Sequence, residues 1–416
     1  MGLLRYHHQQ CLILLSLPMS ADKKRILRTC CTIHLVHDGL TDMLYALLPL
    51  LREAFGLSYA DVALVRSSHR LATALFQIPA SILSERFEPR ILLAFGTLIA
   101  GIGYLGLSLA SGYMAILTFI FLSGCGAGFQ HPLSSGIISN TYPDVGQRSA
   151  IGIYNAFGDI GKMSFLGLTV FITAYLGSSW HLPTQGAGLI AMILAGLVLF
   201  FLKRGQENIS SLENAKLHEA SKTKGWGIKD QNGFYTLSAI AIIDSMTRTG
   251  FLTFVAFLMI EKGITIEWAA SGVFFTAFGG MCGRYAVGLI AEKLGVAKTI
   301  MLTEVATSIL IFVVLAVPSL LAFLLLPVLG VFLNGTSSAI YGTVSDLADS
   351  NKHSRAFGVI YTLGSVCGII APLLYGILAD RFDIETVMIV AALTILLTVP
   401  LCWKLQHRLE ILNRQS

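Results

Sequence analysis

Charged residues are scarce in this chain of 416 residues, at 13% of the total, whereas a soluble chain usually carries about 25%. Hydrophobic residues account for 54%. Because this deficit of charge extends along the whole length, the apolar surface is expected to face lipid rather than one buried core. The formal net charge of +5 is no sign of nucleic-acid binding, since basic residues beside membrane helices usually set their orientation.

Signatures of catalysis and of metal binding are also lacking. The seven cysteines are scattered without CxxC spacing, and the chain has neither an HExxH motif nor a nucleotide-binding P-loop. Gly124, Gly126 and Gly128 lie in an apolar run, where small residues promote helix packing rather than phosphate binding. We therefore expect no enzymatic activity, no metal, no cofactor and no ATP-driven pumping by this chain alone.

Apolar runs of about 20 residues, the length that spans a bilayer core, are abundant. They predict an all-α membrane protein with twelve transmembrane helices near 29–51, 62–84, 91–110, 114–139, 149–176, 185–203, 232–260, 268–290, 297–317, 320–345, 355–378 and 384–404. The expected organisation is an N-terminal tail over 1–28, a six-helix bundle over 29–203, a linker over 204–231, a second six-helix bundle over 232–404 and a tail over 405–416.

The ends of the chain and its orientation follow from short-range features. Cys11–Leu17 is too short an apolar run to span a membrane, and translation starting at Met19 would leave an ordinary basic tail; a functional extension is the alternative. Lysine and arginine concentrate in the loops that share a side with the N-terminus. The positive-inside rule then places both termini in the cytoplasm of a bacterial cell, with the protein in its inner membrane.

An internal repeat divides the chain into two similar halves. A displacement of about 207 positions carries Glu85 and Arg86 to Glu292 and Lys293, and it carries Arg148 to Arg355. Such parallel repeats are typical of secondary transporters, in which two bundles rock about a central site in alternating access.

The loop after the second helix makes the chain resemble the major facilitator superfamily. The family signature there is G-x-L-A-D-R-x-G-R-R, which Ser81–Arg90 matches loosely and Gly288–Gly295 matches better. The sequence Leu47–Leu51 in the first helix and His131–Ser135 in the fourth are similar to those of fosmidomycin-resistance-type exporters. The resemblance implies a monomeric secondary transporter that uses a proton gradient and no cofactor.

Polar side chains recur within the apolar runs at the 3.6-residue period of a helix. A charge at mid-bilayer costs about 2.5–3.5 kcal/mol even on the most lenient scale, so these residues are expected to face a cavity or a partner. Those expected to bind the solute are Arg66, Arg70, His131, Lys162, Asp244, Arg248, Asn334 and Tyr341. Those expected to carry protons are His34, His37, Asp38, Asp42 and Asp159, with Asp38 the leading carboxylate.

Each of these assignments has a plainer interpretation. The pairs Asp159–Lys162 and Asp244–Arg248 are close enough on their helices to be neutralising pairs that only permit burial. Asp42 and Arg66 could simply be solvated near the outer surface. His131 could be a satisfied histidine at a kink before Pro132, and Glu304 is expected at the membrane interface.

A third group of residues sits at the cytoplasmic helix ends. The resemblance implies that they form inter-helix contacts that hold one conformation closed; simple positive-inside topology is the alternative. They are Ser81, Glu85, Arg86, Arg90, Arg148, Gly288, Glu292, Lys293 and Arg355.

The direction of transport is open. A mixed basic and acidic interior suits a small anionic or zwitterionic solute, because guanidinium groups hold carboxylate or phosphate well. The similarity to exporters slightly favours efflux by proton antiport. Proton exporters often carry G-x8-G-x3-G-P in the fifth helix; Gly152 and Gly161 fit, but Phe165 and Leu166 replace Gly-Pro, which favours uptake by symport. A membrane sensor that has lost transport is the least favoured class, because it would have no use for buried charges.

Overall fold

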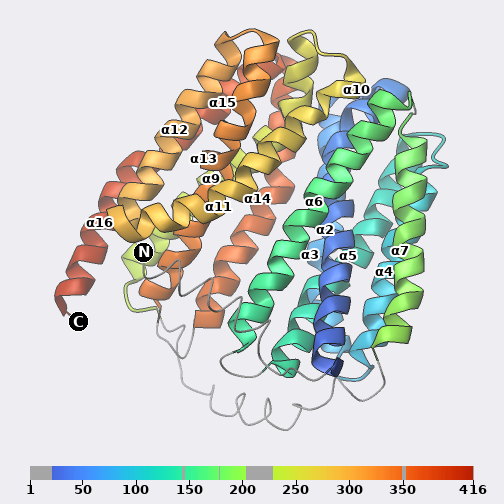
Figure 1. Ribbon diagram of the computed structural model, residues 1–416. Coiled ribbons are helices and arrows are strands. Elements are labelled where there is room, and N and C mark those ends of the chain that lie inside the picture. The colour runs from blue at the N-terminus through green and yellow to red at the C-terminus, as the bar shows by residue number, and fades with distance from the viewer. Residues whose placement is uncertain (1–20, 143–145, 178, 203–227, 349–352, 416) are drawn as a thin grey trace. The chain divides into compact units, whose positions relative to one another are not determined.

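The computed structural model describes residues 21–142, 146–177, 179–202, 228–348 and 353–415, which are almost entirely helical (Figure 1). The predicted N-terminal tail up to residue 20 and most of the predicted linker, residues 204–227, lie outside the described residues. The helices are α2 (Ala21–Phe55), α3 (Tyr59–Leu83), α4 (Pro89–Leu107), α5 (Tyr113–Thr141), α6 (Gln147–Tyr175), α7 (His181–Phe201), α9 (Gln231–Glu261), α10 (Ile266–Ala269), α11 (Ser271–Leu294), α12 (Val296–Ala316), α13 (Ser319–Asp346), α14 (His353–Arg381), α15 (Ile384–Ile395) and α16 (Thr398–Gln415).

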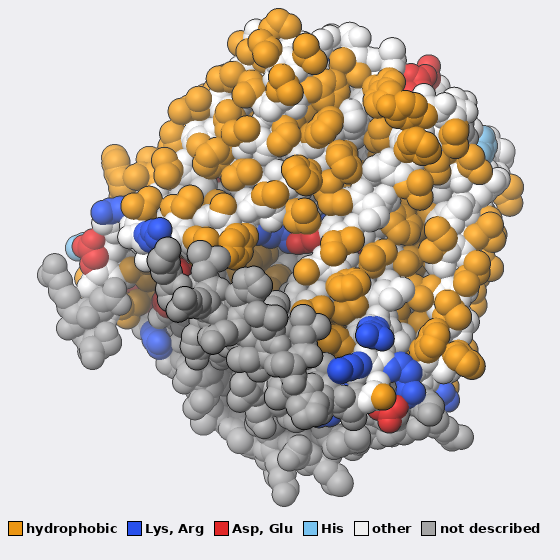
Figure 2. Space-filling view, viewed as in Figure 1, with side chains coloured by type: hydrophobic (Ala, Val, Ile, Leu, Met, Phe, Trp, Pro, Cys, Tyr) orange, Lys and Arg blue, Asp and Glu red, His pale blue; other side chains and the backbone are white. Residues whose placement is uncertain are grey.

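The described helices confirm the prediction of an all-α membrane protein. Ten helical stretches are long and apolar enough to cross a membrane, α10–α11 and α15–α16 each counting as one stretch. The two remaining long helices, α2 and α3, complete the expected twelve and owe their lower hydropathy to their charged residues. Apolar side chains cover most of the helix flanks visible in Figure 2. Large ones such as Phe200 of α7, which is 77% exposed, are as accessible as lipid-facing residues are expected to be.

Several helices extend beyond the predicted apolar runs. The first was predicted over 29–51 but covers Ala21–Phe55, because a hydrophobic window detects only the part of a helix that crosses the bilayer core. The last was predicted as one helix over 384–404 with a tail after it. It is interrupted between α15 and α16 and continues to Gln415. Pro400 explains the interruption, since proline cannot donate the bond to the carbonyl four residues earlier.

The described chain divides into two compact units. Unit 1 comprises the described residues of Met1–Met43, Leu71–Leu168 and Trp180–Thr223. Within it, α4 packs against both α5 and α7. The contacts are close because small residues face each other: a Cβ on Gly101 would lie 2.8 Å from the carbonyl oxygen of Gly188. Small residues of this kind allow membrane helices to approach and gain van der Waals contact.

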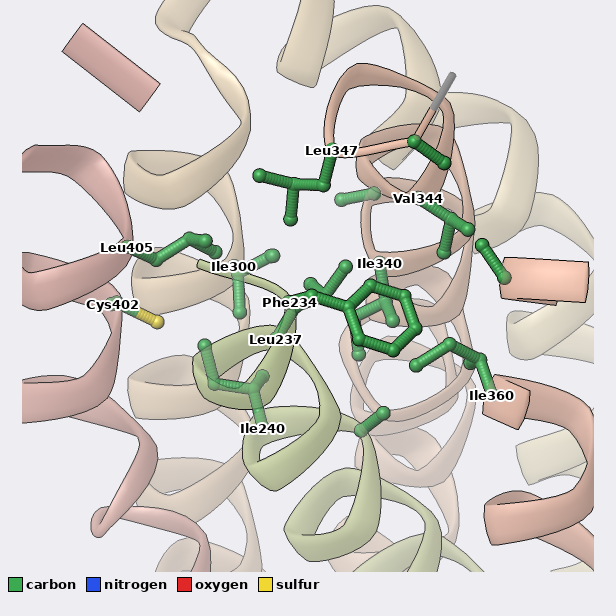
Figure 3. Packing of buried hydrophobic residues seen from close by; sticks show 14 of the residues in the cluster. Phe234, Leu237, Ile240, Ile300, Ile340, Val344, Leu347, Ile360, Cys402 and Leu405 are labelled. Atoms are coloured by element: carbon green, nitrogen blue, oxygen red, sulfur yellow. The ribbon is translucent and has the colours of Figure 1, made fainter. Parts of the chain in front are cut away.

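Unit 2 comprises the described residues of Leu44–Arg70, Thr169–Ser179 and Lys224–Ser416. Its apolar core, shown in part in Figure 3, is formed by side chains of α9, α11, α12, α13, α14 and α16, among them Phe234, Leu237, Ile300, Ile340 and Leu405. Unit 2 thus includes segments of α2, α3 and α6 from the first half of the sequence. The predicted boundary between the two six-helix bundles falls in the linker and stays a prediction.

Hydrogen bonds explain why the beginning of α3 belongs to unit 2. Asp380, near the end of α14, accepts the backbone N–H groups of Tyr59 and Ala60 at 2.7 and 2.8 Å. A carboxylate at a helix N-terminus satisfies free N–H groups and also opposes the positive end of the helix dipole. Ser58 and Asp61 complete the turn, each side chain bonding the backbone N–H of the other.

A second carboxylate, Asp230, begins α9. Its side chain accepts the N–H of Asn232, and Arg408 of α16 donates two hydrogen bonds to it at 2.7 and 2.5 Å. The hydrogen bonds from Arg408 lower the pKa of the Asp230 carboxyl below its ordinary value. Such a pair ties the start of α9 to the last helix of the chain.

We expect this pair to make stability depend on pH. Because the folded carboxyl has the lower pKa, its stabilisation is fully present above the unfolded value of about 3.9 and is lost as pH falls through the folded value. Asp230→Asn, which keeps the helix cap but not the charge, should lower the free energy of unfolding by roughly 1 kcal/mol at neutral pH. The difference from the unsubstituted protein should shrink under acid.

Thermal unfolding of the purified protein as a function of pH measures this effect. Glu385→Gln, at an exposed carboxylate in the first turn of α15, is the matched control. A stability difference between Asp230→Asn and the unsubstituted protein that stays constant down to strongly acidic pH would contradict the assignment.

Candidate functional site

The polar stripe of α2 brings two titratable side chains together in unit 1. His34 and Asp38 stand one helical turn apart and both are buried. The Nε2 atom of His34 lies 3.3 Å from Oδ2 of Asp38. Spacing of i and i+4 places side chains on the same helix face, so this pair follows directly from the sequence.

Helix α6 supplies the cationic partner of Asp38. Lys162 Nζ lies 3.0 Å from Oδ2 of Asp38 and 3.2 Å from Oδ1 of Asp159. The interpretation of Asp159–Lys162 as an isolated pair is therefore incomplete, because the ammonium group bridges two carboxylates on two helices. His131 of α5 adds a third nitrogen, with Nε2 3.5 Å from Oδ1 of Asp38 and a side chain that is 47% exposed. His34, Asp38, His131, Asp159 and Lys162 are called the Asp38 cluster below.

Hydrogen bonding fixes one tautomer of His34. Its Nδ1 atom lies 2.7 Å from the backbone carbonyl oxygen of Tyr154 and can only donate to it. Nε2 then carries no hydrogen in the neutral ring, yet it faces a carboxylate oxygen. A hydrogen bond between His34 and Asp38 requires one more proton, held either by the imidazole or by the carboxyl group. Such an arrangement of imidazole and carboxyl group can hold an exchangeable proton.

Tyr154 and Gln130 form the wall behind the histidine. The Tyr154 ring stacks on His34 with centroids 3.9 Å apart, and Gln130 donates a hydrogen bond of 2.7 Å to the tyrosine hydroxyl. Both residues are buried and were not among the predicted site residues. The displacement of 207 positions that relates the two halves also carries Tyr154 to Tyr361, and this repeat is a sequence signal that could have singled it out.

A metal ion is a poor fit for this cluster. His34, Asp38 and His131 offer ligand atoms within 4.8 Å of one another. The ammonium of Lys162, 3.0 Å from the Asp38 carboxylate, already supplies positive charge there and would repel a cation. The donor set suits a proton and an anion better.

Three other predicted site residues, His37, Asp42 and Arg70, lie on the first two helices. His37 donates from Nε2 to the Thr97 hydroxyl at 3.0 Å, since that hydroxyl gives its own hydrogen to the Leu93 carbonyl. Asp42 and Arg70 are half-buried. Their expected roles in proton and solute binding stay predictions.

The solvated position considered for Arg66 is wrong. Its side chain is fully buried in unit 2, with the guanidinium 3.9 Å above the ring centroid of Tyr45. Stacking on an aromatic face stabilises a cation by about 2 kcal/mol where it is desolvated. The sequence gives little indication of this contact. Arg66 and Tyr45 lie on different helices, and their pairing depends on how α3 packs against α2.

Unit 2 holds a second buried charge group. Asp244 is 3.5 Å from an Arg248 guanidinium nitrogen, and the same nitrogen donates to Ser245 at 3.3 Å. Glu304 of α12, which the sequence placed at the membrane interface, is fully buried and interacts electrostatically with both residues. The start of α12 at Val296 lies within one residue of the predicted start, so the helix end was not the source of the error. Glu304 is enclosed because neighbouring helices pack around α12, and one sequence does not display that packing.

Asn334 and Tyr341 lie on α13, within the helix that the polar spacing predicted. Asn334 is buried and packs against Gly280 of α11, where a Cβ would lie 2.5 Å from its amide nitrogen. The Tyr341 ring lies 5.0 Å from the ring of Tyr361 and interacts electrostatically with Arg248.

The predicted gating residues are mostly exposed in the described structure. Glu85, Arg86, Glu292 and Lys293 are exposed, whereas Arg90 is half-buried and bonds Glu88 at 2.7 Å and the Leu202 carbonyl at 3.1 Å. The Ser81 side chain bonds the Gln77 carbonyl of its own helix, and Gly288 has open space beside it. The side chains of Arg148 and Arg355 lie outside the described residues. The gating role stays a prediction.

Glycines on α6 allow α2 to approach closely enough to form the Asp38 cluster. A Cβ on Gly158 would lie 2.6 Å from Nε2 of His34 and 3.0 Å from Oδ2 of Asp38. Gly161 faces the backbone of Leu35 in the same way. Of the two glycines that the sequence suggested as an exporter feature, Gly161 therefore has a packing role, whereas Gly152 has open space beside it.

We expect Gly158→Ala to destabilise the protein by about 1–3 kcal/mol, the usual cost of forcing an extra methyl group into a packed site. Gly152→Ala is the matched control on the same helix, because a Cβ there would meet open space. The control should be neutral or stabilising by up to about 1 kcal/mol through helix propensity. Thermal unfolding in detergent measures both, and equal stability of the two variants would contradict the close approach of α6 to α2.

Comparison with known proteins gives the family. Residues 30–372, and again 237–413, match the Major Facilitator Superfamily. The chain is 25% identical to the hexuronate transporter of Bacillus subtilis (strain 168) over 353 residues, 80% of this chain and 82% of that protein. It is 24% identical to the D-galactonate transporter of Escherichia coli O6:H1 over 388 residues, 84% and 89% of the two chains. These relatives do not support the narrower similarity to fosmidomycin-resistance-type exporters.

A solved structure shows the same fold. The crystal structure of a bacterial homolog of the human lysosomal transporter Spinster covers 95% of this chain and 98% of its own, with a TM-score of 0.70 at 16% identity. The family match extends over most of the chain. The alignments to the two transporters cover more than four fifths of each of those proteins. The chain therefore belongs to the Major Facilitator Superfamily, as a multi-pass membrane transporter of small solutes and not an enzyme.

Proposed function

We propose that this protein is a proton-coupled symporter of a small organic anion, with the Asp38 cluster as its proton site. The observation that carries the proposal is the bridging position of Lys162, 3.0 Å from Asp38 and 3.2 Å from Asp159. The proposal includes a location in the bacterial cytoplasmic membrane with both termini inside, on the charge asymmetry of the loops.

The solute class is supported by charge and by relatives. Lys162 is a cation whose side chain is 25% exposed, so an anion can reach it. Hexuronates and galactonate, named for the two relatives above, are small hydroxylated carboxylates. A carboxylate with hydroxyl groups would use the ammonium for its charge, and neighbouring polar groups for its hydroxyls.

Electrostatics links the anion to the proton. An anion that binds Lys162 competes with Asp38 for the ammonium, so Asp38 loses part of the charge that stabilises its ionised form. The carboxyl group, with His34 beside it, then holds a proton more tightly. Binding of the anion and of the proton therefore favour each other, and by thermodynamic reciprocity the proton also strengthens anion binding. This positive coupling is what symport requires.

Efflux by proton antiport is the second candidate. The similarity of Leu47–Leu51 and His131–Ser135 to exporter sequences favours it. Antiport needs the solute and the proton to compete, as a cationic or zwitterionic solute would do at Asp38. Phe165 at the place of the exporter glycine weighs against it, since the Phe165 ring packs against Gly39 of α2.

We expect Asp38→Asn to abolish proton-driven accumulation. In proteoliposomes, a pH gradient of one unit should drive about tenfold accumulation of a monovalent anion carried with one proton, since one unit corresponds to 1.36 kcal/mol. The assay uses a panel of small carboxylates that contains a hexuronate and galactonate. Glu385→Gln, at an exposed carboxylate, should accumulate normally.

Two outcomes would contradict symport. Accumulation that ignores the gradient, together with normal transport by Asp38→Asn, would remove Asp38 from the proton site. Accumulation only when the vesicle lumen is the acidic side would show antiport.

A second experiment separates solute binding from charge neutralisation at Lys162. If Lys162 only neutralises carboxylates, Lys162→Met combined with Asp159→Asn restores the charge balance and should transport almost normally. We expect the double variant to stay inactive in the same assay, with less than about a tenth of normal transport, because the anion has lost a charge partner. Near-normal transport by the folded double variant would assign Lys162 to neutralisation alone.

A further inference from the structure

Glu304 is a buried carboxylate that the proposed function does not use. It lies on α12 with no exposed surface, and neither of its carboxylate oxygens has a hydrogen-bond partner among the described residues. A carboxylate left without partners in an apolar interior is among the most expensive groups that a protein can bury. Its state of charge therefore needs an explanation.

The charges around Glu304 do not balance. The carboxylate of Asp244 and the guanidinium of Arg248, both on α9, interact electrostatically with it. Asp244 is 3.5 Å from Arg248, and its second oxygen, Oδ1, is buried without a hydrogen-bond partner among the described residues. Two carboxylates thus share one guanidinium. Four other titratable groups interact with these three residues: Cys402 of α16 with Glu304, Cys367 of α14 with Asp244 and Arg248, and Tyr341 of α13 and Tyr45 of α2 with Arg248.

A proton resolves the imbalance at the lowest cost. With both carboxylates ionised, the group would carry a net negative charge in apolar surroundings, where uncompensated charge costs several kcal/mol. The four uncharged neighbours, two cysteines and two tyrosines, cannot neutralise this charge in their ordinary forms. One bound proton makes the group neutral. It also gives a carboxyl O–H donor to a group in which Oδ1 of Asp244 and both carboxylate oxygens of Glu304 otherwise lack donors among the described residues.

We propose that Asp244, Glu304 and Arg248 form a second proton-binding site, in which the two carboxylates hold one exchangeable proton at neutral pH and Arg248 neutralises the remaining charge. The Arg248 side chain is 23% exposed, so the site is not sealed from its surroundings. The proposal concerns unit 2 alone and does not depend on the identity of the solute or on the role of Asp38.

Infrared spectroscopy of the reconstituted protein tests the proposal without any solute. A protonated carboxyl group absorbs at a frequency distinct from that of a carboxylate, and the band shifts in deuterium oxide when the proton exchanges. In sodium-free buffer at neutral pH, well above the ordinary glutamate pKa of about 4.3, the full-length protein should show such a band. Glu304→Gln should lose it or reduce it by one carboxyl group, and Asp244→Asn should also change it.

Controls separate this site from the rest of the protein. Glu385→Gln should leave the band unchanged, and Asp38→Asn removes any contribution of the Asp38 cluster while leaving this one. If Glu304→Gln does not fold, Asp244→Asn still tests the site. A spectrum that is unchanged in each folded variant of Asp244 and Glu304 would overturn the proposal. Loss of the band in the unsubstituted protein on adding sodium ions at constant pH would also overturn it, by assigning the carboxylates to a metal cation.

Discussion

The neutralisation of Asp38 is the interaction on which the first unit depends. A carboxylate buried among apolar helices persists only where cations or hydrogen-bond donors surround it. Lys162 at 3.0 Å, His34 at 3.3 Å and His131 at 3.5 Å provide them from three helices. Three helices must meet closely for this to happen. Gly158 and Gly161 make that possible, because side chains there would occupy the space of His34 and of the α2 backbone.

Both units bury carboxylates that need neutralisation, but the groups that surround these carboxylates differ between the two. In unit 1, two carboxylates face one lysine and two histidines, so the cluster can change its protonation without leaving a carboxylate isolated. In unit 2, two carboxylates face one arginine, which does not give up its proton in proteins. Any change of charge there must occur on a carboxyl group. This difference supports the two proposals made above, that the first cluster exchanges anion and proton together and that the second holds a proton.

Most of the fold was predictable from the sequence because span length is set by the bilayer. Twelve apolar runs, their order and the family were found in this way, and the i, i+4 pair His34–Asp38 followed from helical periodicity. The ends of helices were not predicted correctly, as α2 and α16 show. A hydrophobic window does not detect helical turns that lie outside the membrane. The exporter subgroup rested on short apolar segments, which many membrane helices share.

The sequence by itself determined which side chains are costly to bury and on which helix face each one lies. It could not determine which helices meet, and that decided the site. Lys162 had a partner in its own helix, Asp159, yet the structure gives it Asp38 of α2 as well. Arg66 and Glu304 resembled residues of the membrane surface and are instead fully buried. Partners on one helix follow from a period of 3.6 residues, whereas partners on different helices depend on packing that one sequence does not display.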